Sequence, residues 1–133
     1  RLGRRLLLTV SDLMHTGEST PKVSADVPLA QALLEMSRKG LGMTAIVDNQ
    51  DRLLGLFTDG DLRRTMDRNI DVHNTLISEV MTTGCKTANE SMMATEALQI
   101  MENMRINGLL ITTDKNRLIG ALNMHDLLKA RIL

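Results

Sequence analysis

The feature that most constrains this chain is an internal duplication. Residues 32–64 align without a gap on residues 97–129. The identical pairs are Ala32/Ala97, Leu33/Leu98, Met36/Met101, Ile46/Ile111, Arg52/Arg117, Leu53/Leu118, Gly55/Gly120, Asp61/Asp126 and Leu62/Leu127. Self-similarity at a fixed period indicates a repeated supersecondary unit. Upstream, residues 10–17 match residues 77–84, after which the first copy carries two extra residues that we place in a loop.

An apolar stripe at positions i, i+3, i+4 and i+7 predicts a helix in each copy. The stripe consists of Leu29, Ala32, Leu33 and Met36 in the first copy and of Ala94, Ala97, Leu98 and Met101 in the second. Asp26 and Ser91 precede the stripes at matching positions. Because such side chains commonly cap helices, we expect Asp26 and Ser91 to be the N-caps.

Short apolar segments predict three strands in each copy. The expected strands are residues 22–24, 43–47 and 53–57 in the first copy and residues 87–88, 109–112 and 118–122 in the second. Gly55 and Gly120 lie in the last of these strands, where a glycine indicates the close approach of a backbone or a ligand. A second helix is expected to begin near Thr58 and near Asn123. Each copy is therefore predicted to have the order β-α-β-β-α, an α/β (α+β) fold.

Residues 55–61, Gly-Leu-Phe-Thr-Asp-Gly-Asp, resemble the signature of the CBS domain: a glycine, two apolar residues, a hydroxyl residue, two variable residues and an aspartate. The second copy keeps Gly120 and Asp126 but has Asn123 in place of the hydroxyl residue. The resemblance covers almost the whole chain. It implies tandem CBS domains packed sheet to sheet with pseudo-two-fold symmetry, and a cleft on each side for an adenine nucleotide or related phosphate ester. We assign residues 10–70 and 71–133 to the two domains.

Four segments are more narrowly similar to the C-terminal CBS pair of bacterial arabinose-5-phosphate isomerases: residues 2–7, 13–17, 57–64 and 124–128. This resemblance implies a parent chain whose N-terminal sugar-isomerase (SIS) domain interconverts ribulose 5-phosphate and arabinose 5-phosphate. That reaction leads to Kdo, a sugar acid of lipopolysaccharide. Residues 1–9 would be the linker from the SIS domain, and we assign no catalytic residue and no enzymatic activity to the present chain. A homo-oligomer is expected, with a dimer of CBS pairs in a tetrameric parent.

Thr58 and Asp61 are candidate ligand-binding residues. A hydroxyl at a strand end, followed by the free amides of a helix start, suits an anion. The Asp61 carboxylate suits the vicinal hydroxyls of a ribose, and Arg63 and Arg64 are placed to reach a phosphate or a carboxylate. The alternative is that Thr58 and Asp61 are ordinary helix caps and that the arginines form a solvated helix face.

The second copy offers the matching candidates Asn123, His125 and Asp126. The family resemblance adds the walls of the clefts: Lys22, Val23, Gly42, Met43, Thr44, Lys86, Thr87 and residues 107–109. The expected ligand is a regulatory nucleotide or nucleotide-sugar such as AMP, ATP or CMP-Kdo, with no required cofactor. Two functions remain open: a ligand-sensing regulator of the attached isomerase, or a structural oligomerisation clamp that senses nothing.

Composition argues against several other classes. With one Phe, no Tyr, no Trp and a formal net charge of zero, the chain lacks the stacking faces and positive field of nucleic-acid binding proteins. His15, His73 and His125 have no partners at metal-ligand spacing, so no metal site is expected. Cys85 is the only cysteine, which favours a cytoplasmic location. No secretory signal and no apolar segment of about 20 residues, as a membrane span requires, is found.

Overall fold

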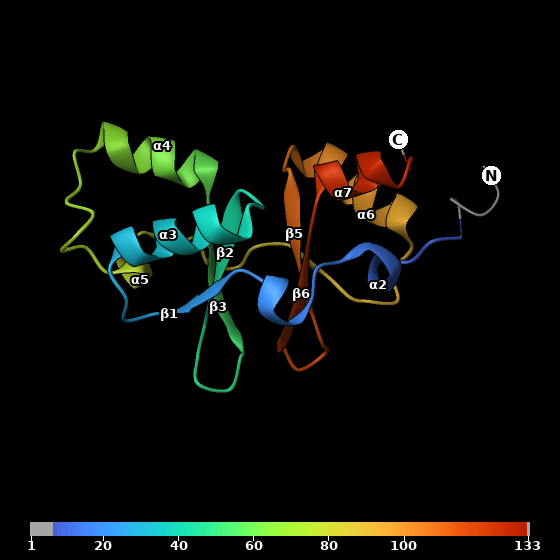
Figure 1. The fold of residues 1–133 in the computed structure, drawn as a ribbon, viewed down its shortest axis with the longest axis horizontal. Helices are drawn as coiled ribbons and strands as arrows, with labels where there is room; N and C mark the ends of the chain where they lie inside the picture. The colour runs from blue at the N-terminus through green and yellow to red at the C-terminus, as the bar shows by residue number, and fades with distance from the viewer. Residues whose placement is uncertain (1–6, 133) are drawn as a thin grey trace. The chain divides into compact units, whose positions relative to one another are not determined.

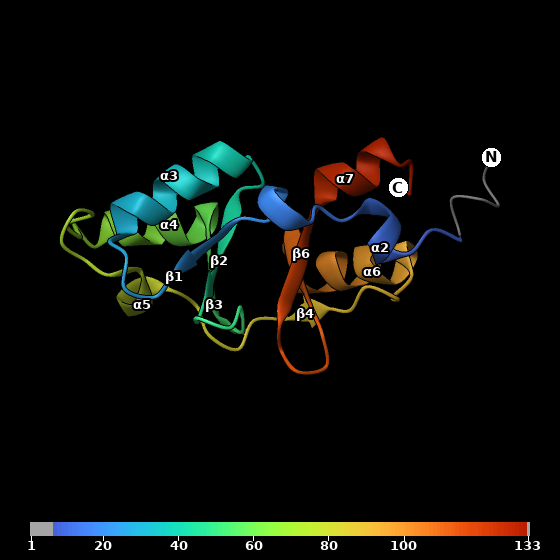
Figure 2. The same ribbon diagram turned by 60° about the horizontal axis from the view of Figure 1, so that its bottom comes forward.

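The computed structural model describes residues 7–132, which form two compact units (Figure 1 and Figure 2). The central unit contains residues 21–85, and the N–C unit combines residues 7–20 with residues 86–132. Residues 1–6 of the predicted linker (residues 1–9) lie outside the described residues, and so does all but the last residue of the isomerase-like segment at residues 2–7.

The central unit contains a three-stranded sheet in the order β1-β2-β3. Its strands are β1 (Lys22–Ser24), β2 (Met43–Val47) and β3 (Leu53–Thr58), and its helices are α3 (Leu29–Lys39), α4 (Asp59–Asp67) and α5 (Ile77–Val80). Strand β1 is parallel to β2, and β3 is antiparallel to β2. Ile46 and Phe57 of the sheet pack against Leu29 and Met36 of α3 in one buried cluster. The α3 stripe therefore faces the core, as its spacing predicts.

The N–C unit repeats this arrangement with the sheet order β4-β5-β6. Its elements are α2 (Val10–Leu13), the 3-10 helix η1 (Gly17–Ser19), β4 (Thr87–Ala88), α6 (Ala94–Met104), β5 (Gly108–Thr112), β6 (Leu118–Asn123) and α7 (Met124–Lys129). Val10 from the N-terminal part of the chain is fully buried in the same cluster as Leu122 and Leu127. The β-α-β-β-α order predicted for each copy is confirmed. The sequence patterns did not predict the short helices α2 and α5, which lie near the start of the two copies.

The predicted N-caps are wrong by two residues. Helix α3 has Pro28 at its N-cap and α6 has Met93, while the Asp26 carboxylate accepts a hydrogen bond of 2.7 Å from Ser24 Oγ. Backbone carbonyls replace the expected side-chain caps. The Leu29 amide donates to the Thr75 carbonyl at 2.7 Å. The free backbone amides in the first turns of α3 and α6 thus donate hydrogen bonds to carbonyls of distant segments. A local sequence pattern does not reveal these partners.

The two compact units do not coincide with the two sequence copies of residues 10–70 and 71–133. Residues 7–20 run into the start of the first copy but pack with the second, and residues 71–85 begin the second copy but pack with the first. We call these the exchanged segments. In each of them one residue forms an antiparallel bridge to the last strand of the unit: His15 pairs with Ala121, and Thr82 pairs with Leu56.

The exchanged segments explain Gly55 and Gly120. A Cβ at position 120 would lie 2.8 Å from the carbonyl oxygen of His15, and one at position 55 would lie 3.0 Å from that of Thr82. The distance at position 120 is too short for a real side chain against backbone, and the one at position 55 is tighter than most real contacts. Of the two predicted reasons for these glycines, the close approach of backbone is the one that the structure shows.

Candidate ligand site

Thr58 and Asp61 cap the N-terminus of α4 through each other. The Asp61 amide donates to Thr58 Oγ1 at 3.2 Å, and the Thr58 amide donates to Asp61 Oδ2 at 2.9 Å. The Thr58 hydroxyl also donates to Asp61 Oδ2, at 3.0 Å. This reciprocal arrangement is a capping box, so the cap interpretation of both residues is observed. A ligand at this position binds around the cap or in exchange for part of it.

The second carboxylate oxygen of Asp61 is the less firmly held one. Oδ1 accepts a hydrogen bond of 2.6 Å from Arg64 Nη2, and Thr82 Oγ1 lies 3.5 Å away. The Arg64 side chain is 71% exposed, whereas that of Asp61 is 14% exposed. Because exposed ion pairs contribute little free energy, hydroxyl groups of a ligand can compete with Arg64 for this oxygen. Arg63, on the same helix, is also exposed.

Gly42, Met43 and Thr44 lie at the same end of the β2–β3 hairpin as Thr58. Met43 is opposite Thr58 in the strand register, and the Asp59 amide donates to the Gly42 carbonyl at 3.0 Å. The side chains of Met43 and Thr44 are buried, at 2% and 0% exposure. The structure therefore gathers the predicted residues Gly42, Met43 and Thr44 near Thr58 and Asp61 but covers two of the predicted cleft walls.

An open hollow of about 330 Å³ lies beside this end of the hairpin. Its lining residues come from α3, α4 and the turn before β2: Leu33, Met36, Ser37, Gly40, Gly42, Asp59 and Leu62. Thr58 and Asp61 are not among them. The hollow adjoins the capping box through Asp59 and Gly42.

The second copy repeats the capping box with an amide in place of the hydroxyl. The Asp126 amide donates to Asn123 Oδ1 at 3.0 Å, and the Asn123 amide donates to Asp126 Oδ2 at 2.9 Å. His125, the third predicted residue here, is exposed. Asp126 Oδ1 has a partner that the sequence analysis did not assign, His15 Nε2 at 2.8 Å. The alignment of residues 10–17 on residues 77–84, which puts His15 at the position of Thr82, was the available signal.

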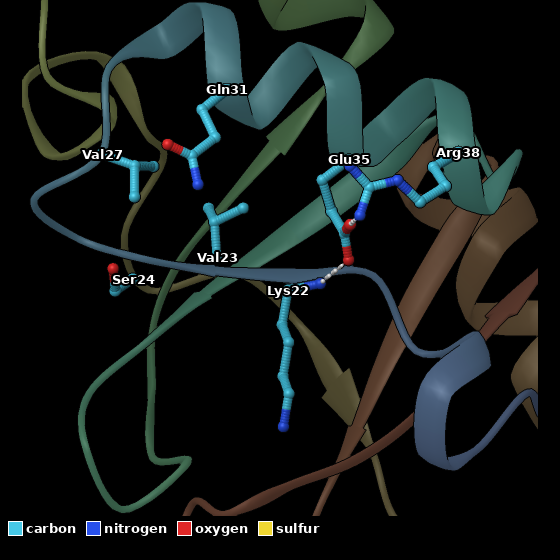
Figure 3. Close-up of a pocket in the computed structure, with 7 residues that line it drawn as sticks. All are labelled: Lys22, Val23, Ser24, Val27, Gln31, Glu35 and Arg38. Carbon is cyan, nitrogen blue, oxygen red and sulfur yellow. Dashed lines mark hydrogen bonds and ion pairs between the residues drawn. The ribbon is translucent and has the colours of Figure 1, made fainter.

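The remaining predicted residues lie elsewhere. Lys22 and Val23 line a separate hollow of about 250 Å³ along β1 and α3, with Ser24, Val27, Gln31, Glu35 and Arg38 (Figure 3). The Lys22 ammonium pairs with Asp51 Oδ1 at 2.9 Å. In the N–C unit, Thr87 Oγ1 accepts a hydrogen bond of 3.3 Å from Thr112 Oγ1, and Lys86 is exposed.

Glu35 is the buried charge of the Lys22 hollow, and the sequence analysis did not single it out. It is 8% exposed and accepts hydrogen bonds from the Lys22 amide at 3.1 Å and from Lys39 Nζ at 2.7 Å. Figure 3 shows its carboxylate between Arg38 and the backbone of Lys22. Burial opposes ionisation, but the bonds from Lys39 and the Lys22 amide, with the charges of Lys39 and Arg38, outweigh it and lower the pKa of Glu35.

We expect Glu35→Gln to lower the free energy of unfolding near pH 7 by about 1–2 kcal/mol, since hydrogen bonds to charged groups are lost. The pKa of Glu35 is lower in the folded chain than its ordinary value of 4.5. The stabilisation is therefore present above pH 4.5 and is lost as the pH falls through the folded-state pKa. Urea denaturation between pH 3 and pH 7 measures this, with the exposed Glu102 of α6 changed to Gln as control. Equal stabilities of the two variants at pH 7 would contradict the expectation.

Three further features of the described residues bear on function. None of the helices in residues 7–132 combines the length and the apolar character needed to cross a membrane. Within the same range, no group of three or more His, Cys, Asp or Glu side chains is arranged to hold a metal ion. Burial raises the pKa of the Cys85 thiol, which disfavours the thiolate that a nucleophile requires.

Comparison with known proteins identifies both halves of the chain. The CBS domain model matches residues 10–68 and residues 77–133. The chain is 52% identical over 132 residues to arabinose 5-phosphate isomerase KdsD of Pseudomonas aeruginosa, and 46% identical over 132 residues to KdsD of Escherichia coli. In both cases the match covers 99% of this chain but 40% of the relative. The chain thus corresponds to the CBS-containing part of longer proteins.

Solved structures agree on the fold. The CBS domain pair of protein MJ0100, in complex with 5′-methylthioadenosine and S-adenosyl-L-methionine, has a TM-score of 0.81 at 21% identity, covering 91% of this chain and 97% of that one. The structure of CBSX2 in complex with AMP has a TM-score of 0.79 at 18% identity, covering 94% and 96%. The signature around Gly55 and Asp61, the two three-stranded sheets and these matches lead to one conclusion: the chain belongs to the CBS domain family, as a tandem pair.

Proposed function

We propose that this CBS pair senses a phosphate-bearing nucleotide or nucleotide-sugar and regulates a sugar-phosphate isomerase in the same parent chain. The observation that carries the proposal is Asp61 Oδ1, an oxygen of a largely buried carboxylate that is held chiefly by the exposed Arg64 at 2.6 Å. The relatives named arabinose 5-phosphate isomerase supply the candidate activity of the parent. The neighbours named in complex with S-adenosyl-L-methionine or AMP support the ligand class.

In the proposed complex, the vicinal hydroxyls of a ribose replace Arg64 at Asp61 Oδ1. A charged acceptor makes such hydrogen bonds stronger than a neutral one does. Arg64 is then free to pair with the phosphate of the same ligand by its planar fork, and Arg63 adds positive charge beside it. AMP, ATP and CMP-Kdo all combine a ribose with a phosphate, and CMP-Kdo adds a carboxylate. Regulation follows if the ligand binds one arrangement of the parent better than another.

Thermal unfolding of the 133-residue chain with AMP, ATP, CMP and CMP-Kdo tests this. A ligand at 100 times its dissociation constant is expected to stabilise the chain by about 2.7 kcal/mol. Asp61→Asn should abolish the shift, and Asp67→Asn, at the exposed end of α4, should retain it. The absence of a shift with all four compounds would contradict the proposal.

A structural clamp is the second candidate function, and the two complete capping boxes favour it. In the clamp, Thr58 and Asp61 serve only α4, and Asn123 and Asp126 serve only α7. The pair then holds a homo-oligomer of the parent together. Light scattering of the parent with and without this chain distinguishes the functions: a clamp predicts dissociation on deletion, together with no thermal shift of the chain by any of the four compounds.

A further inference from the structure

We infer that the two copies are functionally unequal: His15 keeps the carboxylate of Asp126 closed to ligand, so one ligand binds per chain, at Asp61. The inference rests on the proposed function, because it assigns which copy does the sensing. It starts from the exchanged segments, which place one residue beside each of the two aspartates.

The backbone around the two aspartates is nearly the same. The Thr82 amide donates to the Leu56 carbonyl at 2.8 Å, and the Leu56 amide donates back at 2.8 Å. The corresponding bonds between His15 and Ala121 measure 2.8 and 3.0 Å. The side chains of Asp61 and Asp126 are also similarly covered, at 14% and 12% exposure. Against this similar background, the residue of the exchanged segment that faces Oδ1 differs between the two aspartates.

Beside Asp61, in the central unit, that residue is Thr82, whose hydroxyl lies 3.5 Å from Asp61 Oδ1. This distance is at the limit of a hydrogen bond. The firmer contact to the same oxygen comes from Arg64, a side chain that is 71% exposed. A ligand hydroxyl can take this position after the movement of one solvated side chain.

Beside Asp126, in the N–C unit, that residue is His15. Its Nε2 lies 2.8 Å from Asp126 Oδ1, and its side chain is 34% exposed. The backbone of His15 is fixed by its two bonds to Ala121, and its carbonyl lies against Gly120. Withdrawing the imidazole from Asp126 therefore disturbs a contact that is better covered than the one between Arg64 and Asp61. His15 occupies the oxygen that a ribose hydroxyl would need and acts as a positioning residue that closes the second copy.

The near-identical backbones allow the two residues to be exchanged between the copies. Thr82→His places an imidazole at the first carboxylate, and His15→Thr removes it from the second. Because Asn123 also distinguishes the second copy, His15→Thr is combined with Asn123→Thr, and Asn123→Thr alone is the matched control. Isothermal titration with AMP, ATP, CMP and CMP-Kdo gives the number of sites.

We expect one site in the wild-type chain, lost in Asp61→Asn. Thr82→His should weaken binding at least tenfold. Asn123→Thr alone should keep one site, and the combination with His15→Thr should have two, returning to one when Asp126→Asn is added. Two sites in the wild type, two sites in Asn123→Thr alone, or unaltered binding in Thr82→His would overturn the inference.

A double-mutant cycle that measures melting temperature tests the contact between His15 and Asp126 without any ligand. Asp126→Asn and His15→Thr should be coupled, because each removes the same contact, whereas Asp61→Asn and Thr82→Ala should be nearly additive. A cycle without coupling between His15 and Asp126 overturns the inference whatever the titrations give. An absence of binding to the wild type by all four compounds, with the coupling intact, contradicts the proposed function and leaves the closed second copy supported.

Discussion

Phe57→Ala is expected to lower the free energy of unfolding by about 3–5 kcal/mol, the usual cost of removing a buried aromatic ring. Phe57 is the only aromatic residue of the chain and is 0% exposed. It packs with Leu29, Ile46 and Ile77 in the core of the central unit. Because the core is closely packed, these neighbours can only partly fill the space of a lost ring. The loss is a large part of the total stability of about 5–15 kcal/mol typical of a protein this size.

Urea denaturation followed by circular dichroism measures this loss. Leu34→Ala is the control, because Leu34 lies on α3 of the same unit but is 62% exposed, and we expect a change within about 0.5 kcal/mol. A difference of less than about 1 kcal/mol between the two variants would show that the central unit does not depend on the ring.

The second large effect is expected for Gly120→Ala, which should destabilise the chain by about 2–4 kcal/mol through steric overlap and weakened hydrogen bonds. The new Cβ would lie 2.8 Å from the carbonyl oxygen of His15. That oxygen belongs to the backbone and accepts the Ala121 amide at 3.0 Å. Relief of the overlap therefore requires movement of the whole bridge between residues 15 and 121.

Gly60→Ala is a matched control with the opposite expected sign. A Cβ at Gly60 would meet its nearest atoms, in Arg64 and Thr58, at 3.7 Å, which is an ordinary contact. Since alanine favours helix over glycine by about 0.5–1 kcal/mol, this variant in α4 should be neutral or more stable. Similar unfolding midpoints for the two variants would be incompatible with a tight approach of the exchanged segment at Gly120.

Much of the fold was predictable because it is repeated. The repeat in the sequence predicts one structural unit that occurs twice. The spacing of Leu29 and Met36 identifies the buried face of the first helix of that unit. The N-caps at Asp26 and Ser91 were wrong for a physical reason. The amides of the first turn of α3 bind the carbonyls of Val72 and Thr75, which are more than forty residues away along the chain.

The candidate site was predicted in part. The spacing of Thr58 and Asp61 within four residues reveals a local capping box, and the strand pairing brings Gly42 beside them. His15 and Glu35 were missed because their roles depend on contacts between distant segments. The imidazole of His15 contacts Asp126, a residue that is 111 positions away in the sequence. The carboxylate of Glu35 accepts a hydrogen bond from the amide of Lys22, which lies in the edge strand β1.

The exchanged segments also set the order in which the chain can fold as it leaves the ribosome. The central unit is a continuous stretch, residues 21–85, so all of its parts are present once that stretch has emerged. Residues 7–20 are made earlier, but Val10 is buried against strands and helices that are made after the central unit. We therefore expect residues 7–20, which emerge before the central unit, to reach their native place after it, with apolar side chains such as Val10 exposed until residues 86–132 have also emerged.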